Sequence, residues 1–231
     1  MQPELQSRTT YPVAGEITQQ QHRVLRNTYL LLALTMVPTV IGAMIGMATG
    51  GIIMQHPIIS TFVMLGAVIG LQFAIMANRD NGFGVVLLLG MTFLLGWWLG
   101  PLLTVALSLS NGPQLVGFAA LGTGGIFLVM ATIATTTKRD FSFMGKFLFV
   151  GMIVLLIAMI ANMFMQIPAL ALTISALVIV VFSLFLLHDV SRIVNGGETN
   201  YIMATTGVYL SLFNIFANLL HLLMALGGER D

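Results

Sequence analysis

The sequence contains seven apolar runs, and each is long enough to cross the hydrocarbon core of a bilayer as a helix. A transmembrane helix needs roughly 20 predominantly apolar residues. We expect spans at residues 29–49, 57–77, 83–107, 114–134, 147–165, 169–187 and 204–226. These spans use most of the 231 residues, so no soluble domain fits in the remainder. The sequence therefore predicts an all-α integral membrane protein with seven transmembrane helices.

The composition agrees with a chain whose main solvent is lipid. Asp, Glu, Lys and Arg together make up 7% of the residues and apolar types 58%, whereas a soluble domain carries about 25% charged residues. The sequence has no cysteine. That absence excludes disulfides, thiolate catalysis and sulfur-ligated metals.

The basic residues indicate which side of the membrane each connection occupies. Of the nine Lys and Arg residues, all but one lie before the first span or after the second, fourth and sixth. They are Arg8, Arg23, Arg26, Arg79, Lys138, Arg139, Lys146 and Arg192. Because Lys and Arg concentrate in short cytoplasmic loops, we expect a cytoplasmic amino terminus and a carboxyl terminus outside. Only Arg230 lies on the outer side.

The polar ends of the chain bound the predicted membrane domain. We expect residues 1–28 to form a flexible cytosolic tail, residues 29–226 the transmembrane domain, and residues 227–231 a short outer tail. Pro38 and Pro101 are expected to kink their helices. Small residues four apart favour close helix packing in lipid, and they occur at Gly42 and Gly46, Gly66 and Gly70, and Gly96 and Gly100.

One face of the last predicted span is polar or small along its whole length. Residues spaced alternately four and three apart lie within a sector of roughly 100° on a helix. We call this set the polar stripe: Asn200, Ala204, Gly207, Ser211, Asn214, Asn218 and His221. Unsatisfied amides cost several kcal/mol in hydrocarbon, so the stripe must face protein or water.

Two interpretations of the polar stripe remain open. One is hydrogen bonding to other helices, with Gln72, Asn162 and Gln166 as candidate partners. The other is one wall of a hydrated cavity or pore, for which the candidate lining residues are Ser211, Asn214, Asn218 and His221.

Asp189 is the only acidic residue expected at membrane depth, near the inner end of the sixth span. Arg192 follows three residues later on the same helix face, which makes it the simplest ion-pair partner. A second hypothesis is that Asp189 and Arg192 form a pH-sensitive latch, because burial can bring protonation of a carboxyl group into the physiological range.

The sequence lacks the patterns of the enzyme and metal sites found in membranes. His22, His56, His188 and His221 are scattered without metal-ligand spacing on one helix. There is no His-Glu-x-x-His or Gly-x-Ser protease element, and the last span has no lysine for a retinal Schiff base. We therefore expect a non-enzymatic protein with no catalytic residues, no metal, no cofactor and no nucleic-acid partner.

Several segments from His22 onward carry a family resemblance. They are residues 22–29, 99–101, 137–143, 162–170, 196–202 and 209–216. Over these segments the chain resembles the Bax inhibitor-1 family, and specifically its bacterial YccA-like branch. The resemblance implies a multi-pass protein of the bacterial inner membrane in which six helices surround a central seventh. It also implies two activities, which are restraint of the membrane-anchored AAA protease FtsH and a pH-sensitive leak of calcium or other cations.

One departure from the family pattern bears on the choice between these activities. In the leak-channel members, an Asp on the sixth helix faces an Asp on the seventh within Tyr-Leu-Asp, and the pair shares a proton. Here the first position matches Asp189, but the second is Ser211. A hydroxyl cannot supply the like-charge repulsion on which that coupling depends. The resemblance therefore favours a modulator, and client, of FtsH, with a cation leak through Asp189 and the polar stripe as the alternative.

Overall fold

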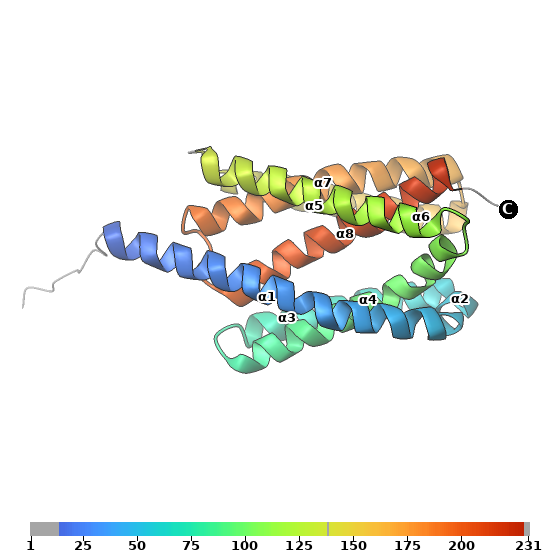
Figure 1. Ribbon diagram of the computed structural model, residues 1–231, viewed down its shortest axis with the longest axis horizontal. Coiled ribbons are helices and arrows are strands. Elements are labelled where there is room, and N and C mark those ends of the chain that lie inside the picture. Colours follow the sequence, from blue (N-terminus) through green and yellow to red (C-terminus); the bar gives the residue numbers. More distant parts are fainter. Residues whose placement is uncertain (1–13, 138, 229–231) are drawn as a thin grey trace, which may run out of the picture.

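The computed structural model describes residues 14–137 and 139–228. Within these ranges it is a bundle of long helices without strands (Figure 1). The helices are α1 (Ala14–Thr49), α2 (Gly51–Gln55), α3 (Pro57–Ala77), α4 (Gly82–Leu107), α5 (Gly112–Thr136), η1 (Ser142–Met144), α6 (Gly145–Met165), α7 (Pro168–Val194) and α8 (Tyr201–Gly227). Seven of them are long and apolar enough to cross a membrane. The prediction of an all-helical protein with seven spans is confirmed.

The helix bounds follow the predicted spans closely except at the start of α1 and at the end of α7, which continues from the predicted limit at residue 187 to Val194. α3 matches the predicted span at residues 57–77, whereas α1 begins at Ala14 rather than at residue 29. Residues 14–28, expected to belong to a flexible tail, are therefore helical. Val24 on this extension is buried against Ile193 of α7 and Ala204 of α8, which stabilises the helix beyond the apolar run. Residues 1–13 and 229–231 of the two predicted tails lie outside the described residues.

Both prolines expected to kink helices lie inside continuous helical segments, Pro38 in α1 and Pro101 in α4.

α1 and α4 pack against each other so closely that their backbones touch. A Cβ atom on Gly42 would lie 2.1 Å from the carbonyl oxygen of Phe93, and one on Gly46 would lie 2.1 Å from that of Trp97. The glycines of α1 therefore allow the close packing that their spacing indicates.

The same spacing on α3 has no such partner. A Cβ atom on Gly66 or Gly70 would meet nothing within 4 Å among the described residues. The expectation of close packing is therefore wrong for this pair within the chain, although it is correct for Gly42, Gly46, Gly96 and Gly100. The spacing of small residues indicates where helices can approach, but it does not say which of these faces has a neighbour.

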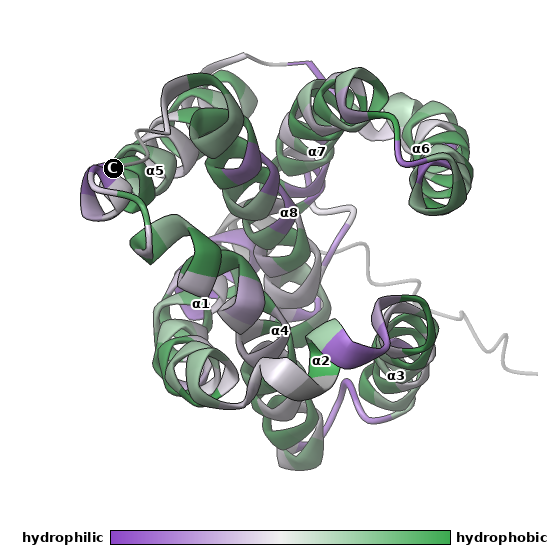
Figure 2. Cartoon of the chain, turned by 90° about the vertical axis from the view of Figure 1, so that its right-hand side faces the viewer, coloured by the Kyte–Doolittle hydropathy of each residue, from purple (hydrophilic) through white to green (hydrophobic). Residues whose placement is uncertain are grey.

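α8 lies in the interior of the bundle (Figure 2). It contacts α1, α3, α4, α5 and α7, and α6 packs chiefly on α7. Tyr209 and Ile215 of α8 are 2% and 0% exposed, and both belong to the largest cluster of buried apolar residues. α1 begins at one end of the long axis and α8 finishes at the other (Figure 1). Because α8 lies among several helices, its different faces contact different neighbours.

Candidate functional site

The polar stripe of α8 lies against α7. A Cβ atom on Gly207 would lie 2.7 Å from Oδ2 of Asp189, so the carboxylate rests directly against the α8 backbone. Near the other end of α8, Nδ1 of His221 lies 3.0 Å from the hydroxyl oxygen of Ser175 on α7. The stripe therefore contacts α7 at Gly207 and at His221.

The two asparagines in the middle of the stripe bond to their own helix. Nδ2 of Asn214 donates to the carbonyl oxygen of Leu210 at 2.8 Å, and Nδ2 of Asn218 donates to that of Asn214 at 2.9 Å. Among the described residues, no hydrogen bond joins the stripe to the candidate partners Gln72, Asn162 and Gln166. A local backbone bond thus uses one N–H of each amide without a partner helix.

The first residue of the stripe acts at the start of α8. Asn200 accepts hydrogen bonds from the backbone N–H groups of Ile202 and Met203, which caps the helix. Its amide nitrogen donates to the carbonyl oxygen of Arg79 at 2.8 Å and to Oδ1 of Asp80 at 3.0 Å. Asn200 therefore ties α8 to the connection between α3 and α4.

Asp189 does not pair with Arg192. Its Oδ1 lies 3.0 Å from Nδ1 of His188, and its side chain is 19% exposed. Arg192 instead donates to Oε2 of Glu198 at 3.4 Å and to the carbonyl oxygen of Gly197 at 3.1 Å. Gly196 adopts φ 75°, a conformation that favours glycine, and the chain turns back toward Arg192.

The expected ion pair between Asp189 and Arg192 is therefore wrong for this structure, while a latch function stays a prediction. Ser211, where the resemblance leads one to expect a second acid, is 2% exposed. No hydrogen bond joins it to Asp189 in the described part of the chain. The two helices meet at Asp189 through the glycine at position 207 rather than through a pair of polar side chains.

The connection between α5 and α6 is fixed to α7 close to Asp189. The backbone N–H of Phe141 donates to the hydroxyl oxygen of Ser191 at 3.1 Å, and that oxygen also accepts from Asn195 at 3.0 Å. In the same connection, hydrogen bonds from the Ser142 side chain and backbone lower the pKa of the exposed carboxyl of Asp140, with a smaller contribution from the charge of His188. These contacts order the connection.

A pocket of about 620 Å³ lies on a different face of α8, between α1 and α5. We call it the α1–α5 groove. Its lining is mostly apolar: Tyr29, Leu32, Ala33, Met36, Thr39, Val40, Ala43, Leu99, Leu103, Val116, Ala120, Thr123, Gly124, Phe127, Tyr209, Leu212, Phe213 and Phe216. None of Ser211, Asn214, Asn218 and His221 is among these residues, so the groove is not the polar cavity expected along the stripe.

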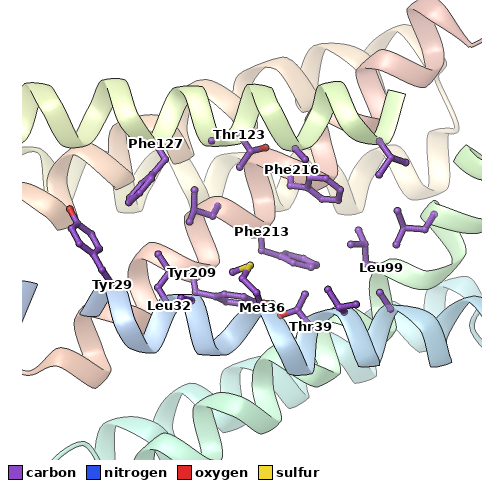
Figure 3. A pocket seen from close by; sticks show the side chains of 18 residues that line it. Tyr29, Leu32, Met36, Thr39, Leu99, Thr123, Phe127, Tyr209, Phe213 and Phe216 are labelled. Carbon is purple, nitrogen blue, oxygen red and sulfur yellow. Dashed lines mark hydrogen bonds between the residues drawn. The ribbon is translucent and has the colours of Figure 1, made fainter. Parts of the chain in front are cut away.

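At one end of the groove, the rings of Tyr29 on α1 and Phe127 on α5 meet edge to face with centroids 5.9 Å apart (Figure 3). Phe213 projects from α8 between the two helices. The hydroxyl of Tyr209 lies 2.8 Å from that of Thr39, and the hydroxyl of Thr123 donates to its own helix. The hydroxyls of Thr39, Thr123 and Tyr209 in the lining are therefore bonded to the protein.

The sequence analysis missed this groove. Its α1 residues recur with helical spacing, but apolar residues with that spacing also cover any lipid-facing helix surface. The groove forms because α1 is separated from α5, and the small residues on its walls, such as Ala33, Ala120 and Gly124, were the only signal of it in the sequence.

Within the described residues, no group of three His, Cys, Asp or Glu could hold a metal ion.

The segments that match known proteins cover nearly the whole chain. The family model described as "Inhibitor of apoptosis-promoting Bax1" matches residues 21–228. An uncharacterized membrane protein of Vibrio cholerae is 41% identical over 90% of this chain and 92% of its own length. A protein of Neisseria meningitidis serogroup A is 38% identical over 92% of this chain and 95% of its own length.

A further relative has a name that states an activity. The Escherichia coli K12 protein named "Modulator of FtsH protease YccA" is 40% identical over 87% of this chain and 90% of its own length. An E. coli O6:H1 protein with the same identity and coverage is named an inner membrane protein. These names describe a modulator and membrane proteins rather than enzymes.

Proposed function

Because the chain belongs to the Bax inhibitor-1 family, we propose that it acts in the bacterial inner membrane as a modulator, and also a client, of an FtsH-type membrane-anchored protease. The observation that carries the proposal is the 40% identity to the relative named as a modulator of FtsH, over 90% of that relative's length. The role proposed is non-enzymatic, and it requires neither a metal nor a cofactor.

The amino-terminal part of α1 is the segment that such a protease could engage. α1 projects beyond the neighbouring helices at its first end (Figure 1). Arg23 and Arg26 on this extension are exposed, and their charge favours a cytoplasmic position. An unfoldase pulls on chain segments outside the membrane, and here the contact of Val24 with α7 and α8 would resist that pull. We propose that this resistance lets the protein occupy the protease and slow its turnover of other membrane proteins.

A turnover experiment in cells tests this function. The half-life of a separate membrane substrate of the protease should lengthen when the chain is overproduced, and the chain itself should be stabilised when the protease is absent. Deletion of residues 1–20 should weaken both effects, whereas deletion of residues 1–5 serves as the control for truncation alone. Unchanged half-lives of substrate and chain in all strains would refute both modulation and the client role.

We further propose that the amino terminus is cytoplasmic, the carboxyl terminus is outside, and α8 is the central helix that the other six surround. The distribution of Lys and Arg supports the orientation. The contacts of α8 with α1, α3, α4, α5 and α7 support its central place. Cysteines introduced at positions 80 and 110 should be labelled by a membrane-impermeant maleimide from opposite sides. Labelling of both from the same side would overturn the orientation.

A cation leak is the second candidate, and one observation favours it. The carboxylate of Asp189 rests against the backbone of Gly207 on the polar stripe, beside His188. We propose as the alternative that a change in pH alters the α7–α8 contact at this site and admits calcium or another cation. Calcium flux into proteoliposomes at pH 6 and pH 8 should then differ and should disappear in Asp189→Asn. Leak-free traces from folded protein would remove this candidate.

A further inference from the structure

We infer that the helices form two rigid units, α1–α4 and α5–α8, which open and close against each other about a hinge at the α4–α5 connection. Figures 1 and 2 show α1, α3 and α4 on one side of α8 and α5, α6 and α7 on the other. The chain passes from the first unit to the second once, through residues 108–111. We call the boundary between the units the seam. Because the sequence has no cysteine, the far end of the seam, where α1 and α8 begin, is held by non-covalent contacts alone.

Each unit is closely packed within itself. In the first unit, the backbones of α1 and α4 touch at Gly42, and Nε1 of Trp97 donates to the hydroxyl oxygen of Thr49 at 2.8 Å. In the second unit, α5 and α6 both pack on α7, and α8 rests against Asp189 of α7 at Gly207. Closely packed regions resist compression and transmit displacement, so each unit moves as one body.

The seam is packed less well than the units. The α1–α5 groove of about 620 Å³ lies on it, because α1 and α4 line the groove on one side and α5 and α8 on the other. Among the described residues, Oγ1 of Thr28 is the only buried side-chain nitrogen or oxygen atom without a hydrogen bond, and Thr28 lies beside Thr205 of α8. A buried hydroxyl without a partner costs free energy, and opening of the seam would let water bond to it.

Few hydrogen bonds hold the seam closed. Within the described residues, those that join the two units all involve α8 or its cap. The hydroxyls of Thr205 and Tyr209 lie 3.4 Å from carbonyl oxygens of α1 and α4, which is long for a hydroxyl donor. Asn200 bonds to the exposed turn before α4, where water can take its place. The strongest bond across the seam is therefore that between the hydroxyls of Tyr209 and Thr39, which are 2.8 Å apart.

The contacts at the α4–α5 connection identify that end as the hinge. Ala106 of α4 belongs to a buried apolar cluster with Leu115 and Ala119 of α5 and Leu220 of α8. Apolar contacts also cross the seam elsewhere, but lipid tails are as apolar as these side chains, so their separation in a bilayer lacks the hydrophobic cost that it has in water. With the connection intact, the units part at the opposite end, where α1 and α8 begin.

Three threonines of α1 offer a matched series of variants. Threonine and valine are both β-branched, so each Thr→Val change replaces a hydroxyl by a methyl group. Thr39→Val deletes the strongest bond across the seam, whereas Thr49→Val deletes a bond within the first unit. Both residues also bond to the carbonyl oxygen four residues earlier, so that loss is common to the two variants. Thr28→Val removes the buried hydroxyl that has no partner.

The experiment measures distances between spin labels on the full chain in lipid nanodiscs by double electron–electron resonance. Labels are attached to cysteines introduced in pairs at exposed positions. Phe83 and Phe147 form the open-end pair across the seam, Leu107 and Phe164 the hinge-end pair across the seam, and Leu30 and Phe83 the control pair within the first unit. The open-end pair should give a closed distance and a second, longer one, while the hinge-end and control pairs each give one narrow distance.

The three variants should change the open-end pair in different directions. Thr39→Val should raise the ratio of the long to the short distance about fivefold, the equivalent of one hydrogen bond, and Thr49→Val should leave it unchanged. Added to Thr39→Val, Thr28→Val should lower the ratio again by at least about fivefold, because only the closed form buries the hydroxyl without a partner. Tyr209→Phe deletes the other hydroxyl of the same bond, so it should act as Thr39→Val does.

The control pair reports whether each variant is folded, because it should stay narrow in all of them. A single narrow distance for the open-end pair in the parent, in Thr39→Val and in Tyr209→Phe would overturn the inference. Equal responses to Thr39→Val and Thr49→Val would overturn it too, as would a rise of the long distance on addition of Thr28→Val. Broadening of the control pair together with the open-end pair would show a generally loose bundle in place of two rigid units.

Discussion

Replacing Gly46 with alanine should separate α1 from α4. The added Cβ atom would lie 2.1 Å from the carbonyl oxygen of Trp97, whereas a carbon and a carbonyl oxygen in contact are about 3.3 Å apart. The helices must therefore move apart locally by about 1.2 Å, and gaps of that size forfeit a large part of the dispersion contact. Overpacking costs about 1–3 kcal/mol, and the upper half of that range applies because backbone atoms cannot rotate away.

Part of this cost is offset by helix propensity, since alanine is favoured over glycine in a helix by roughly 1 kcal/mol. The free energy of unfolding should therefore fall by about 1–2 kcal/mol, which lowers the unfolding midpoint by roughly 2–8 °C for a chain of this size. Thermal unfolding in detergent can be followed by the fluorescence of Trp97 and Trp98, because Trp97 lies in the α1–α4 contact and donates to the hydroxyl of Thr49.

The control is Gly66→Ala on α3, where the new Cβ atom meets nothing within 4 Å. Its midpoint should equal or slightly exceed that of the parent. If Gly46→Ala has the same midpoint as Gly66→Ala, then α1 and α4 do not pack through these glycines, and the helix contact described above is wrong.

Three other substitutions test single contacts. Tyr209→Phe removes the hydroxyl that pairs with Thr39, and it should lower the free energy of unfolding by about 1 kcal/mol in the same assay. Asn200→Ala removes the amino-terminal cap of α8 and should cost about 1–2 kcal/mol, whereas Asn200→Ser should restore part of the loss. Ser142→Ala should raise the depressed pKa of Asp140 toward its ordinary value, as measured by a carboxyl NMR titration. A depressed carboxyl pKa stabilises the folded protein at a pH above the unfolded-state pKa, and this stabilisation is lost as the pH falls through the folded-state pKa. Above both pKa values, the variant should therefore gain less stability from Asp140 than the parent does. An unchanged titration of Asp140 would refute the assignment to Ser142.

The sequence predicted the helices well where the membrane itself imposes their limits. Residues 57–77 form α3 as expected because the apolar run is bounded by Pro57 at its start and by a polar turn at Asn78. The start of α1 was missed because residues 14–28 are mostly polar, and a helix outside the membrane has no apolar run to reveal it. Tertiary contacts such as that of Val24 show why the helix continues there.

The candidate site was predicted less completely, since partners depend on the packing of separate helices. That the polar stripe faces protein or water follows from the cost of burying amides in lipid, but its contacts with α7 at Gly207 and His221 do not. The pairing of Arg192 was wrong because spacing along one helix favoured Asp189, whereas the turn at Gly196 brings Glu198 to the guanidinium. The α1–α5 groove depends on a gap between helices, which no single segment encodes.

The place of α8 has a consequence for biosynthesis. A ribosome makes this helix after the other six, and yet it supplies the surface against which α1, α3, α4, α5 and α7 pack. Until α8 enters the bilayer, Asp189 lacks the contact that it makes with the backbone at Gly207. The nascent bundle therefore lacks a shared packing surface until its last helix has been inserted.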